Sequence, residues 1–197
     1  MIPTPINLKG RWAQLLPLER SHLPALETAA SDGRLWELFF TSVPAPDLLE
    51  AWFETAMAQQ TKALALPFVV VEAETNKVIG STRYCNIDSA NKRLEIGYTW
   101  YGASYQRSAI NTECKLLLLT HAFEVLGCNA VEFRTDWFNH RSQAAIERLG
   151  AKRDGVLRSH IVMPDGRVRD TVVYSILKHE WPGVKANLSF KLQSHSR

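Results

Sequence analysis

The stretch from residue 93 to residue 149 constrains the fold more than any other part of the chain, because its pattern switches from strand to helix and back. Residues 93–100 and 130–137 combine aromatic and β-branched side chains, as strands do. Between them, apolar side chains recur at helical spacing over residues 111–126. A strand, a helix and a strand in this order can form a crossover unit, so we expect these two strands to be parallel neighbours in one sheet.

The rest of the chain predicts antiparallel neighbours for that unit. Strands are expected over residues 12–18, 68–72, 78–86, 93–100, 130–137, 155–162 and 168–177. Helices are expected over residues 20–30, 32–40, 47–65, 111–126 and 139–149. The last helix starts at the N-cap Asn139 and ends at Gly150, and Asp165-Gly166 signals a hairpin between the last two strands. The fold class is therefore α/β (mixed α+β), with a central mixed, mostly antiparallel sheet of about seven strands and helices on both faces.

Length and composition fit one folded domain. The chain has 197 residues, of which 46% are hydrophobic and 22% charged, so it can bury a sizeable core. We assign residues 1–182 to a single domain. The chain is polar from Lys178 onward, and residues 183–197 are expected to form a loosely held C-terminal tail.

The charge distribution has two interpretations. A net charge of +3 is too small to indicate a nucleic-acid-binding protein, and the basic residues do not interleave with aromatic ones, so no nucleic-acid partner is expected. Basic side chains nevertheless gather in the second half of the chain, at Arg107, Lys115, Arg134, Arg141, Arg148, Lys152 and Arg153. They fit either a ligand with several phosphates or a solvated basic surface.

Several classes of protein are not expected. The three cysteines, Cys85, Cys114 and Cys128, are far apart and form no C-x-x-C pair, which argues against a disulfide framework and a metal site. No apolar run approaches the roughly 20 residues of a membrane-spanning helix. The residues from Met1 to Pro5 lack the charged and apolar regions of a signal peptide. We therefore expect a cytoplasmic protein without a membrane partner.

The most informative stretch runs from Leu94 to Lys115, where a strand ending at Trp100 leads through a polar loop into a helix near Asn111. The first turn of a helix has unpaired N–H groups and a partial positive charge, so it can bind an anion such as pyrophosphate. Neutral donors and positive charge surround this helix start, at Gln106, Arg107, Ser108, Thr112 and Lys115. Neither a Walker loop nor a G-x-G-x-x-G loop is present. An ordinary capped helix remains the alternative to a phosphate site.

This stretch resembles the pyrophosphate loop of the GNAT acyltransferases, whose pattern is Q/R-x-x-G-x-G/A. Gln106 fits the first position, whereas Ala109 stands where glycine is usual and Asn111 where glycine or alanine is usual. Glycine lets the backbone approach the pyrophosphate closely, and alanine is small enough to keep that approach.

Flanking segments are similar to the RimJ/RimL-like group within this family, over roughly Leu8 to Pro182. The matching segments are Glu95-Ile96-Gly97-Tyr98 before the loop, Asn139-His140-Arg141-Ser142 followed by Arg148-Leu149-Gly150-Ala151, Asp170 to Ser175, and Glu180-Trp181. Several segments in the family's order are far more specific than any one of them.

The resemblance implies a GNAT-like fold with acetyl-CoA as co-substrate and no metal. Its pantetheine arm would lie between the strands that end at Trp100 and near Trp137. The resemblance assigns cofactor contacts to the backbone at Thr99 and Trp100, to the Asn139 side chain, and to the loop residues Gln106, Arg107, Ser108, Ala109, Ile110 and Asn111.

Two residues are candidates for the chemistry. Ser142 matches the family's donor to the departing thiolate, and its alternative role is to complete the helix cap. Glu95 is the candidate for steering or deprotonating the amine, with a strand-edge carboxylate paired to Arg93 or Arg83 as the alternative. Asp136 and His160 are substitutes for Glu95 in this role.

The resulting hypothesis is an N-acetyltransferase that moves an acetyl group directly from acetyl-CoA to a primary amine of a small molecule or a protein N-terminus. The alternative is a non-catalytic acyl-CoA-binding module, and a homodimer is left open. Aromatic side chains over residues 35–40 and at Trp52-Phe53 would either line the acceptor mouth or belong to the core. Few carboxylates accompany them, which disfavours a polycationic acceptor.

Overall fold

A single eight-stranded sheet organises the computed structural model, which describes residues 3–41, 43–163 and 165–194. Its order is β1-β2-β3-β4-β5-β6-β8-β7, and every neighbouring pair is antiparallel except β5 and β6. The strands are β1 (Leu8–Lys9), β2 (Ala13–Pro17), β3 (Leu66–Glu72), β4 (Val78–Asp88), β5 (Arg93–Tyr101), β6 (Ala130–Asp136), β7 (Lys152–Val162) and β8 (Val168–Leu177). The predicted mixed sheet is confirmed, and the short strand β1 is added to it.

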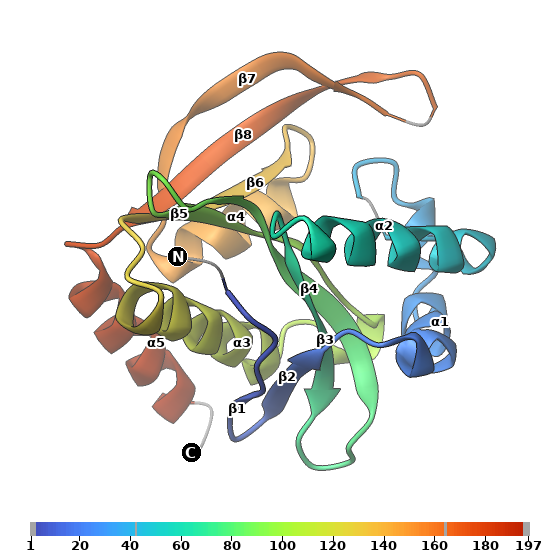
Figure 1. Cartoon of the computed structure of the whole chain (residues 1–197), viewed down its shortest axis with the longest axis horizontal. Coiled ribbons are helices and arrows are strands. Elements are labelled where there is room, and N and C mark those ends of the chain that lie inside the picture. Colours follow the sequence, from blue (N-terminus) through green and yellow to red (C-terminus); the bar gives the residue numbers. More distant parts are fainter. Residues whose placement is uncertain (1–2, 42, 164, 195–197) are drawn as a thin grey trace.

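Helices cover both faces of the sheet, as predicted (Figure 1). One face packs on α1 (Leu23–Ser31) and α2 (Leu49–Thr61), and short 3-10 turns precede them at Arg20–His22 and Pro46–Leu48. The other face packs on α3 (Ala109–Thr120), α4 (His140–Leu149) and α5 (Trp181–Ser194). A π-turn, His121–Val125, extends α3, and a 3-10 turn, Ala103–Tyr105, precedes it. The described residues include no helix with the length and apolar character needed to span a membrane.

The helix expected over residues 32–40 is wrong. Gly33 and Arg34 have φ values of 90° and 46°, so the backbone turns left-handed directly after α1. Only a single 3-10 turn, Leu35–Glu37, follows it. The remaining residues of this segment form a loop that reaches the candidate site.

Two helix boundaries also differ from the prediction. The helix expected over residues 47–65 stops at Thr61, because Ala63 has a φ of 55° and leads directly into β3. Helix α3 begins at Ala109 rather than Asn111, with Ser108 as its N-cap: the Ser108 hydroxyl accepts a hydrogen bond from the Ile110 N–H (3.3 Å).

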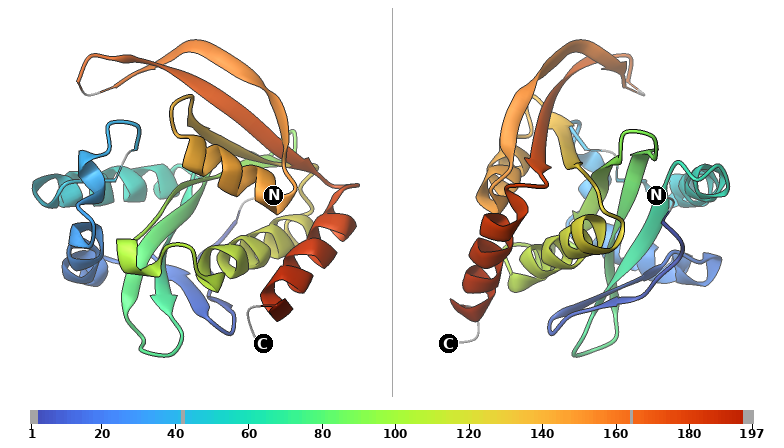
Figure 2. Two further views of the ribbon diagram at one scale, coloured as in Figure 1. Left: turned by 180° about the vertical axis from the view of Figure 1, so that it is seen from behind. Right: turned by 60° about the vertical axis from the view of Figure 1, so that its left-hand side comes forward.

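The expected loose tail is helix α5 as far as Ser194. Four apolar side chains at helical spacing, Trp181, Val184, Leu188 and Leu192, are buried. Trp181 stacks on Phe123 and donates a hydrogen bond from Nε1 to Glu124 (2.7 Å). Burial of each of these apolar side chains contributes roughly 2 kcal/mol to the free energy of unfolding. The mostly polar composition of the segment gives no indication of this burial. Figure 2 shows α5 lying beside α3.

Hairpin β7–β8 arches away from the sheet towards the loop before α2 (Figure 1). Arg167 joins the hairpin to that loop by donating a hydrogen bond to the Phe39 carbonyl (3.1 Å). The same guanidinium pairs with Asp136 at the end of β6 (2.9 Å). One side chain therefore connects three segments that are distant in the sequence.

Candidate active site

The parallel strands β5 and β6 part almost as soon as they meet. Their register covers only Arg93 with Ala130, Leu94 with Val131 and Glu95 with Glu132, although both strands continue well beyond these pairs. A cavity of about 760 Å³ lies where they separate, between the ends of the two strands and the starts of α3 and α4. The predicted location, between the strand ending near Trp100 and the strand ending near Trp137, therefore contains a real opening.

The loop before α3 is braced on both sides. Gln106 donates from its amide nitrogen to the Tyr101 carbonyl (3.1 Å) and accepts from Arg141 on α4 (2.9 Å). Arg107 has a φ of 61°, a left-handed conformation that glycine adopts more readily. The Ser108 hydroxyl donates to the Tyr105 carbonyl (2.7 Å). This bracing holds the first N–H groups of α3 at the cavity wall.

The predicted loop residues divide into two groups. Gln106, Arg107, Ser108 and Asn111 line the cavity. Ala109 and Ile110 have buried side chains in the first turn of α3, so only their backbone could serve a ligand. The Asn111 side chain accepts a hydrogen bond from the Tyr101 hydroxyl (3.2 Å), and it does not cap the helix.

The cavity wall is strongly basic. In the described part of the chain, its lining contains six basic side chains, Arg107, Lys115, Arg134, Arg141, Arg148 and Arg169, against a single acidic one, Asp136. Five of these bases belong to the basic group noted in the second half of the sequence, and the fold brings them together. Such a wall suits an anionic ligand better than a cationic one.

Lys115 is a buried cation at the centre of this wall. Its Nζ donates a hydrogen bond to the Thr99 hydroxyl (2.6 Å). That hydroxyl also contacts the Thr82 hydroxyl (2.7 Å). Burial lowers the pKa of Lys115 to about 8, so its charge is costly to keep and only weakly compensated. Thr99 and Trp100 line the same opening.

Helix α4 presents Ser142 to the cavity with its hydroxyl unengaged. The Asn139 Oδ1 accepts a hydrogen bond from the Ser142 N–H (3.0 Å), which confirms Asn139 as the N-cap. The Ser142 hydroxyl forms no hydrogen bond with the described residues, and both residues line the cavity. The cap therefore uses the backbone of Ser142 and leaves its side chain available.

Glu95 lies behind the cavity wall rather than in it. It is 7% exposed, and its Oε2 accepts a hydrogen bond from Asn86 (2.7 Å). The same oxygen pairs with Arg134 (3.5 Å), which replaces the partners considered from the sequence, Arg93 and Arg83. Burial raises the pKa of Glu95, and the Asn86 hydrogen bond and the Arg134 charge partly oppose that rise.

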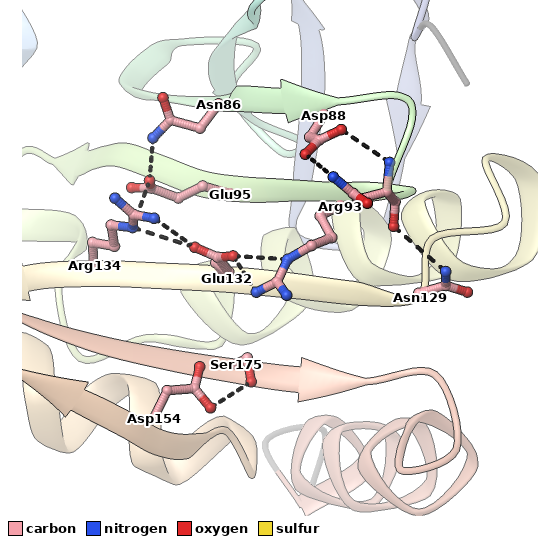
Figure 3. A network of polar contacts seen from close by, with 10 residues as sticks. Asn86, Asp88, Arg93, Glu95, Asn129, Glu132, Arg134, Asp154 and Ser175 are labelled. Carbon is pink, nitrogen blue, oxygen red and sulfur yellow. Dashed lines mark hydrogen bonds and ion pairs between the residues drawn. The ribbon is translucent and has the colours of Figure 1, made fainter.

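Figure 3 shows Glu95 in a network that crosses three strands. Arg134 contacts both Glu95 and Glu132, and Glu132 also accepts a hydrogen bond from the Arg93 Nε (3.0 Å). This network ties β5 to β6 at the last residues of their shared register. Glu95 and Glu132 are therefore engaged with protein partners.

The end of the cavity away from the start of α3 is mostly apolar, with one basic side chain, Arg169. Leu35, Leu38, Phe40, Thr41 and Val43 line it from the loop before α2, together with Tyr98 from β5. Phe53 belongs to the core and Trp36 and Trp52 pack against it partly buried, outside the cavity lining, so the aromatic mouth considered from the sequence is only partly formed. Tyr98 has a φ of 51° at an irregularity in the β4–β5 register, which turns its ring to this end.

The two substitutes for Glu95 behave differently. Asp136 lines the cavity but is held by Arg167 and by the Phe138 N–H (2.9 Å). His160 is exposed on β7, contacts the Thr171 hydroxyl (3.1 Å), and lies outside the lining. The structure therefore does not bring His160 to the site.

Sequence reasoning missed the contribution of two cavity residues. Arg169 belongs to a strand far along the chain, and only the β6–β8 pairing brings it close. Tyr98 is placed by a local irregularity that has no distinct sequence pattern. Lys115 was noted as a charge, but its burial depends on the packing of α3 against the sheet.

Comparison with known proteins identifies relatives of this chain. The model of the acetyltransferase (GNAT) domain family matches residues 14–152. YdaF of Bacillus subtilis (strain 168), provisionally named a ribosomal N-acetyltransferase, is 37% identical over 100 residues, or 51% of this chain and 54% of that protein. The match thus spans about half the length of this curated relative.

Solved structures extend the similarity over nearly the whole chain. One from T. thermophilus, provisionally named an acetyltransferase, has 38% identity and a TM-score of 0.86, covering 98% of this chain and 100% of that one. Mycobacterium smegmatis RimJ, solved with CoA-disulfide, has 20% identity and a TM-score of 0.80, covering 95% of each chain. At that identity the likeness concerns the fold alone.

Proposed function

The chain belongs to the acetyltransferase (GNAT) family, and we propose from this premise that it transfers an acetyl group from acetyl-CoA directly to a primary amine, on a small molecule or a protein N-terminus. The observation that carries the proposal is the opening between β5 and β6, which meets the start of α3 and is lined by six basic side chains. This arrangement combines a slot for an extended arm with a site for phosphates.

The residues present fit coenzyme A. Thr99 and Trp100 would bind the pantetheine arm through the backbone of β5, and Asn139 would contact the arm from α4. The pyrophosphate would bind the N–H groups of Arg107, Ser108, Ala109, Ile110 and Asn111, with Gln106 bracing the loop. Arg141 and Arg148 add charge from α4, and Arg148 also donates to the Thr112 hydroxyl (2.8 Å). When bound, acetyl-CoA supplies an activated acyl group.

The protein then has to position the amine and assist the leaving group. Holding a neutral amine beside the thioester carbonyl replaces a bimolecular step by an effectively unimolecular one. The Ser142 hydroxyl, which forms no hydrogen bond with the described part of the chain, would donate a hydrogen bond to the departing sulfur. The role of Glu95 stays a prediction. Its carboxylate lies behind the residues that line the cavity, so any effect on the amine would pass through Arg134 or a water molecule.

Direct transfer needs no acyl-enzyme. Cys85, Cys114 and Cys128 are all buried, and burial raises the pKa of each thiol. Such thiols are poor nucleophiles because little thiolate forms. We therefore expect no acetylated cysteine after the protein is mixed with acetyl-CoA alone.

Two measurements on the full chain test the proposal. Thermal unfolding with and without CoA reports binding, since a ligand of the native state raises Tm. Release of free thiol from acetyl-CoA over a panel of amines reports transfer. Stabilisation by CoA together with thiol release supports an acetyltransferase. Stabilisation without release for any amine supports the non-catalytic binding module, and an unchanged Tm contradicts both.

A further inference from the structure

We propose that the acceptor amine carries an acidic group, a carboxylate or a phosphate, and that Arg169 binds this group at the apolar end of the cavity. The inference rests on the proposed function and adds the chemical class of the acceptor. Arg169 lines the cavity and has no carboxylate partner among the described residues.

The position of Arg169 separates it from the phosphate end. It lies on β8, two residues before Thr171, which pairs with Asp136 at the end of β6. The charged groups that act on its pKa are Asp136, Glu95 and Arg167, and Asp136 and Arg167 pair with each other at the end of β6. The start of α3 has its own cations in Arg107, Arg141 and Arg148, so Arg169 is not needed there.

The neighbouring carboxylates are already committed to other arginines. Asp136 pairs with Arg167 (2.9 Å), Glu95 with Arg134 (3.5 Å), and Glu132 is shared by Arg134 (2.9 Å) and Arg93. Arg169 donates its Nε to the Thr171 hydroxyl (3.1 Å), and no carboxylate in the described ranges forms an ion pair with it. Its other guanidinium nitrogens are therefore available to a ligand.

A partly buried guanidinium without an ion-pair partner costs free energy unless a ligand compensates it. Burial lowers the pKa of Arg169, the charges of Asp136 and Glu95 partly oppose this, and the charge of Arg167 adds to the lowering. A bound carboxylate or phosphate would remove this cost and could accept two parallel hydrogen bonds from the guanidinium. An amine without an acidic group would leave the cost in place.

A second cation reinforces the positive potential at this end. Arg83 is 1% exposed and lies between the rings of Trp52 and Tyr98, with 5.1 and 4.1 Å from its central carbon to the ring centroids. Its Nη1 donates to Gln59 (3.2 Å), whereas its Nε and Nη2 have no hydrogen-bond partner in the described residues. Tyr98 separates it from the cavity, so Arg83 contributes charge rather than contact.

The test uses acceptors that differ in one group. The dipeptide amides Ser-Asp and Ser-Asn have the same amine and nearly the same shape, as do Asp-Phe and Asn-Phe, and Ser-phosphoserine replaces the carboxylate by a phosphate. In at least one pair we expect kcat/KM to be at least about tenfold higher for the acidic acceptor than for its neutral partner. The reason is that the neutral acceptor can form only a neutral hydrogen bond in place of a charge-assisted one. The Asp and phosphoserine arms distinguish the two acidic groups.

Arg169→Gln should abolish this preference by lowering kcat/KM for the acidic acceptors to the level of their neutral partners, and Arg169→Lys should restore part of it. Arg158→Gln is the matched control, because Arg158 lies on the same hairpin, its side chain is 82% exposed, and it pairs with Asp170 outside the cavity. The inference is overturned if no acidic acceptor is preferred, if none is acetylated, or if Arg169→Gln keeps the preference. Failure of CoA to raise the Tm of the wild-type chain would instead contradict the proposed function.

Discussion

At the scale of single residues, Lys115 shows a conflict between folding and site chemistry. Its Nζ is buried, donates to the Thr99 hydroxyl, lies 5.9 Å from the centre of the Phe133 ring, and forms no ion pair with a carboxylate in the described ranges. Such a lysine is poor for stability, and conflicts of this kind concentrate at functional sites. Its pKa of about 8 lies below the 10.5 of a free lysine. Between these values the unfolded chain holds more protons at this position than the folded chain, so this residue's contribution to the free energy of unfolding rises with pH.

We therefore expect Lys115→Met to lose that contribution. The stability of the variant relative to the wild type should be highest at pH 7 and should fall by a few kcal/mol between pH 8 and pH 10.5. Denaturant unfolding at several pH values measures it, with Lys62→Met at an exposed position as the control. A pH-independent difference would show that the Lys115 pKa is not lowered.

Ser142 is the residue whose effect should be confined to the rate. Its N–H is used by the cap and its hydroxyl is not, so Ser142→Ala preserves the cap and removes only the donor. We expect kcat to fall by about tenfold to a hundredfold with little change in acetyl-CoA affinity. Steady-state kinetics and a CoA titration measure the two quantities. If the rate is unchanged with chemistry rate-limiting, the hydroxyl does not assist the departing sulfur.

At the scale of elements, the loop before α3 depends on its charge and on its backbone. Arg107 is exposed, so Arg107→Ala should weaken CoA binding only about threefold, whereas Arg107→Glu should weaken it by about tenfold or more, because it places a negative charge beside the phosphates. Calorimetric titration with CoA measures both variants, and Lys62→Glu controls for net charge. Equal affinities for the two Arg107 variants would place this side chain away from the phosphates.

Helix α3 is also fastened to the N-terminal strands by Glu113. Its carboxylate accepts hydrogen bonds from the N–H groups of Arg11, Trp12 and Ala13, each 2.7 Å long. A Gln side chain has one acceptor oxygen, so Glu113→Gln would leave at least one of these amides unsatisfied. We expect a loss of about 2 kcal/mol in the free energy of unfolding, measured by denaturant titration. Glu27→Gln, at an exposed position, should change it by less than about 0.5 kcal/mol.

The elements also show what a sequence can predict. The order of elements from β5 to α4 was predicted correctly, because the patterns that indicate it are local: the apolar spacing in α3, the Asn139 cap and the end of α4 at Gly150. The left-handed turn at Arg34 and the burial of α5 were missed, because a positive φ at a non-glycine residue and the packing of a sparse apolar stripe both depend on distant contacts.

The candidate site was predictable to the same degree. Gln106, Arg107, Ser108, Asn111, Asn139 and Ser142 line the cavity, because each lies next to an element end, and their roles stay predictions. The partner of Glu95 was wrong, because it depends on the register of β5 with β6 and on side-chain direction across two strands. Arg169 required the pairing of β8 with β6, which no local pattern encodes.

At the scale of the whole molecule, basic side chains gather in the cavity, whereas most acidic ones lie outside it. Three carboxylates near the loop before α2 are engaged away from the cavity: Glu50 and Glu54 contact Arg20, and Glu37 contacts Arg34. The cavity itself has a basic lining with one committed acid among the residues that the structure describes. A protein with a net charge of only +3 thus offers its ligands a strongly positive interior surface.

The early parting of β5 and β6 gives this sheet an edge strand in its interior. Beyond Glu95, the side of β5 that faces β6 has no ladder partner in the described chain, as at the rim of an ordinary sheet, and a ligand rich in amides can pair there like an added strand. Backbone amides of residues 98–101 that are not bonded to β4 should exchange rapidly with deuterium in the free protein and slowly with CoA bound. Amides of residues 94 and 95 should change little. The molecule would then complete its own sheet only when it holds its co-substrate.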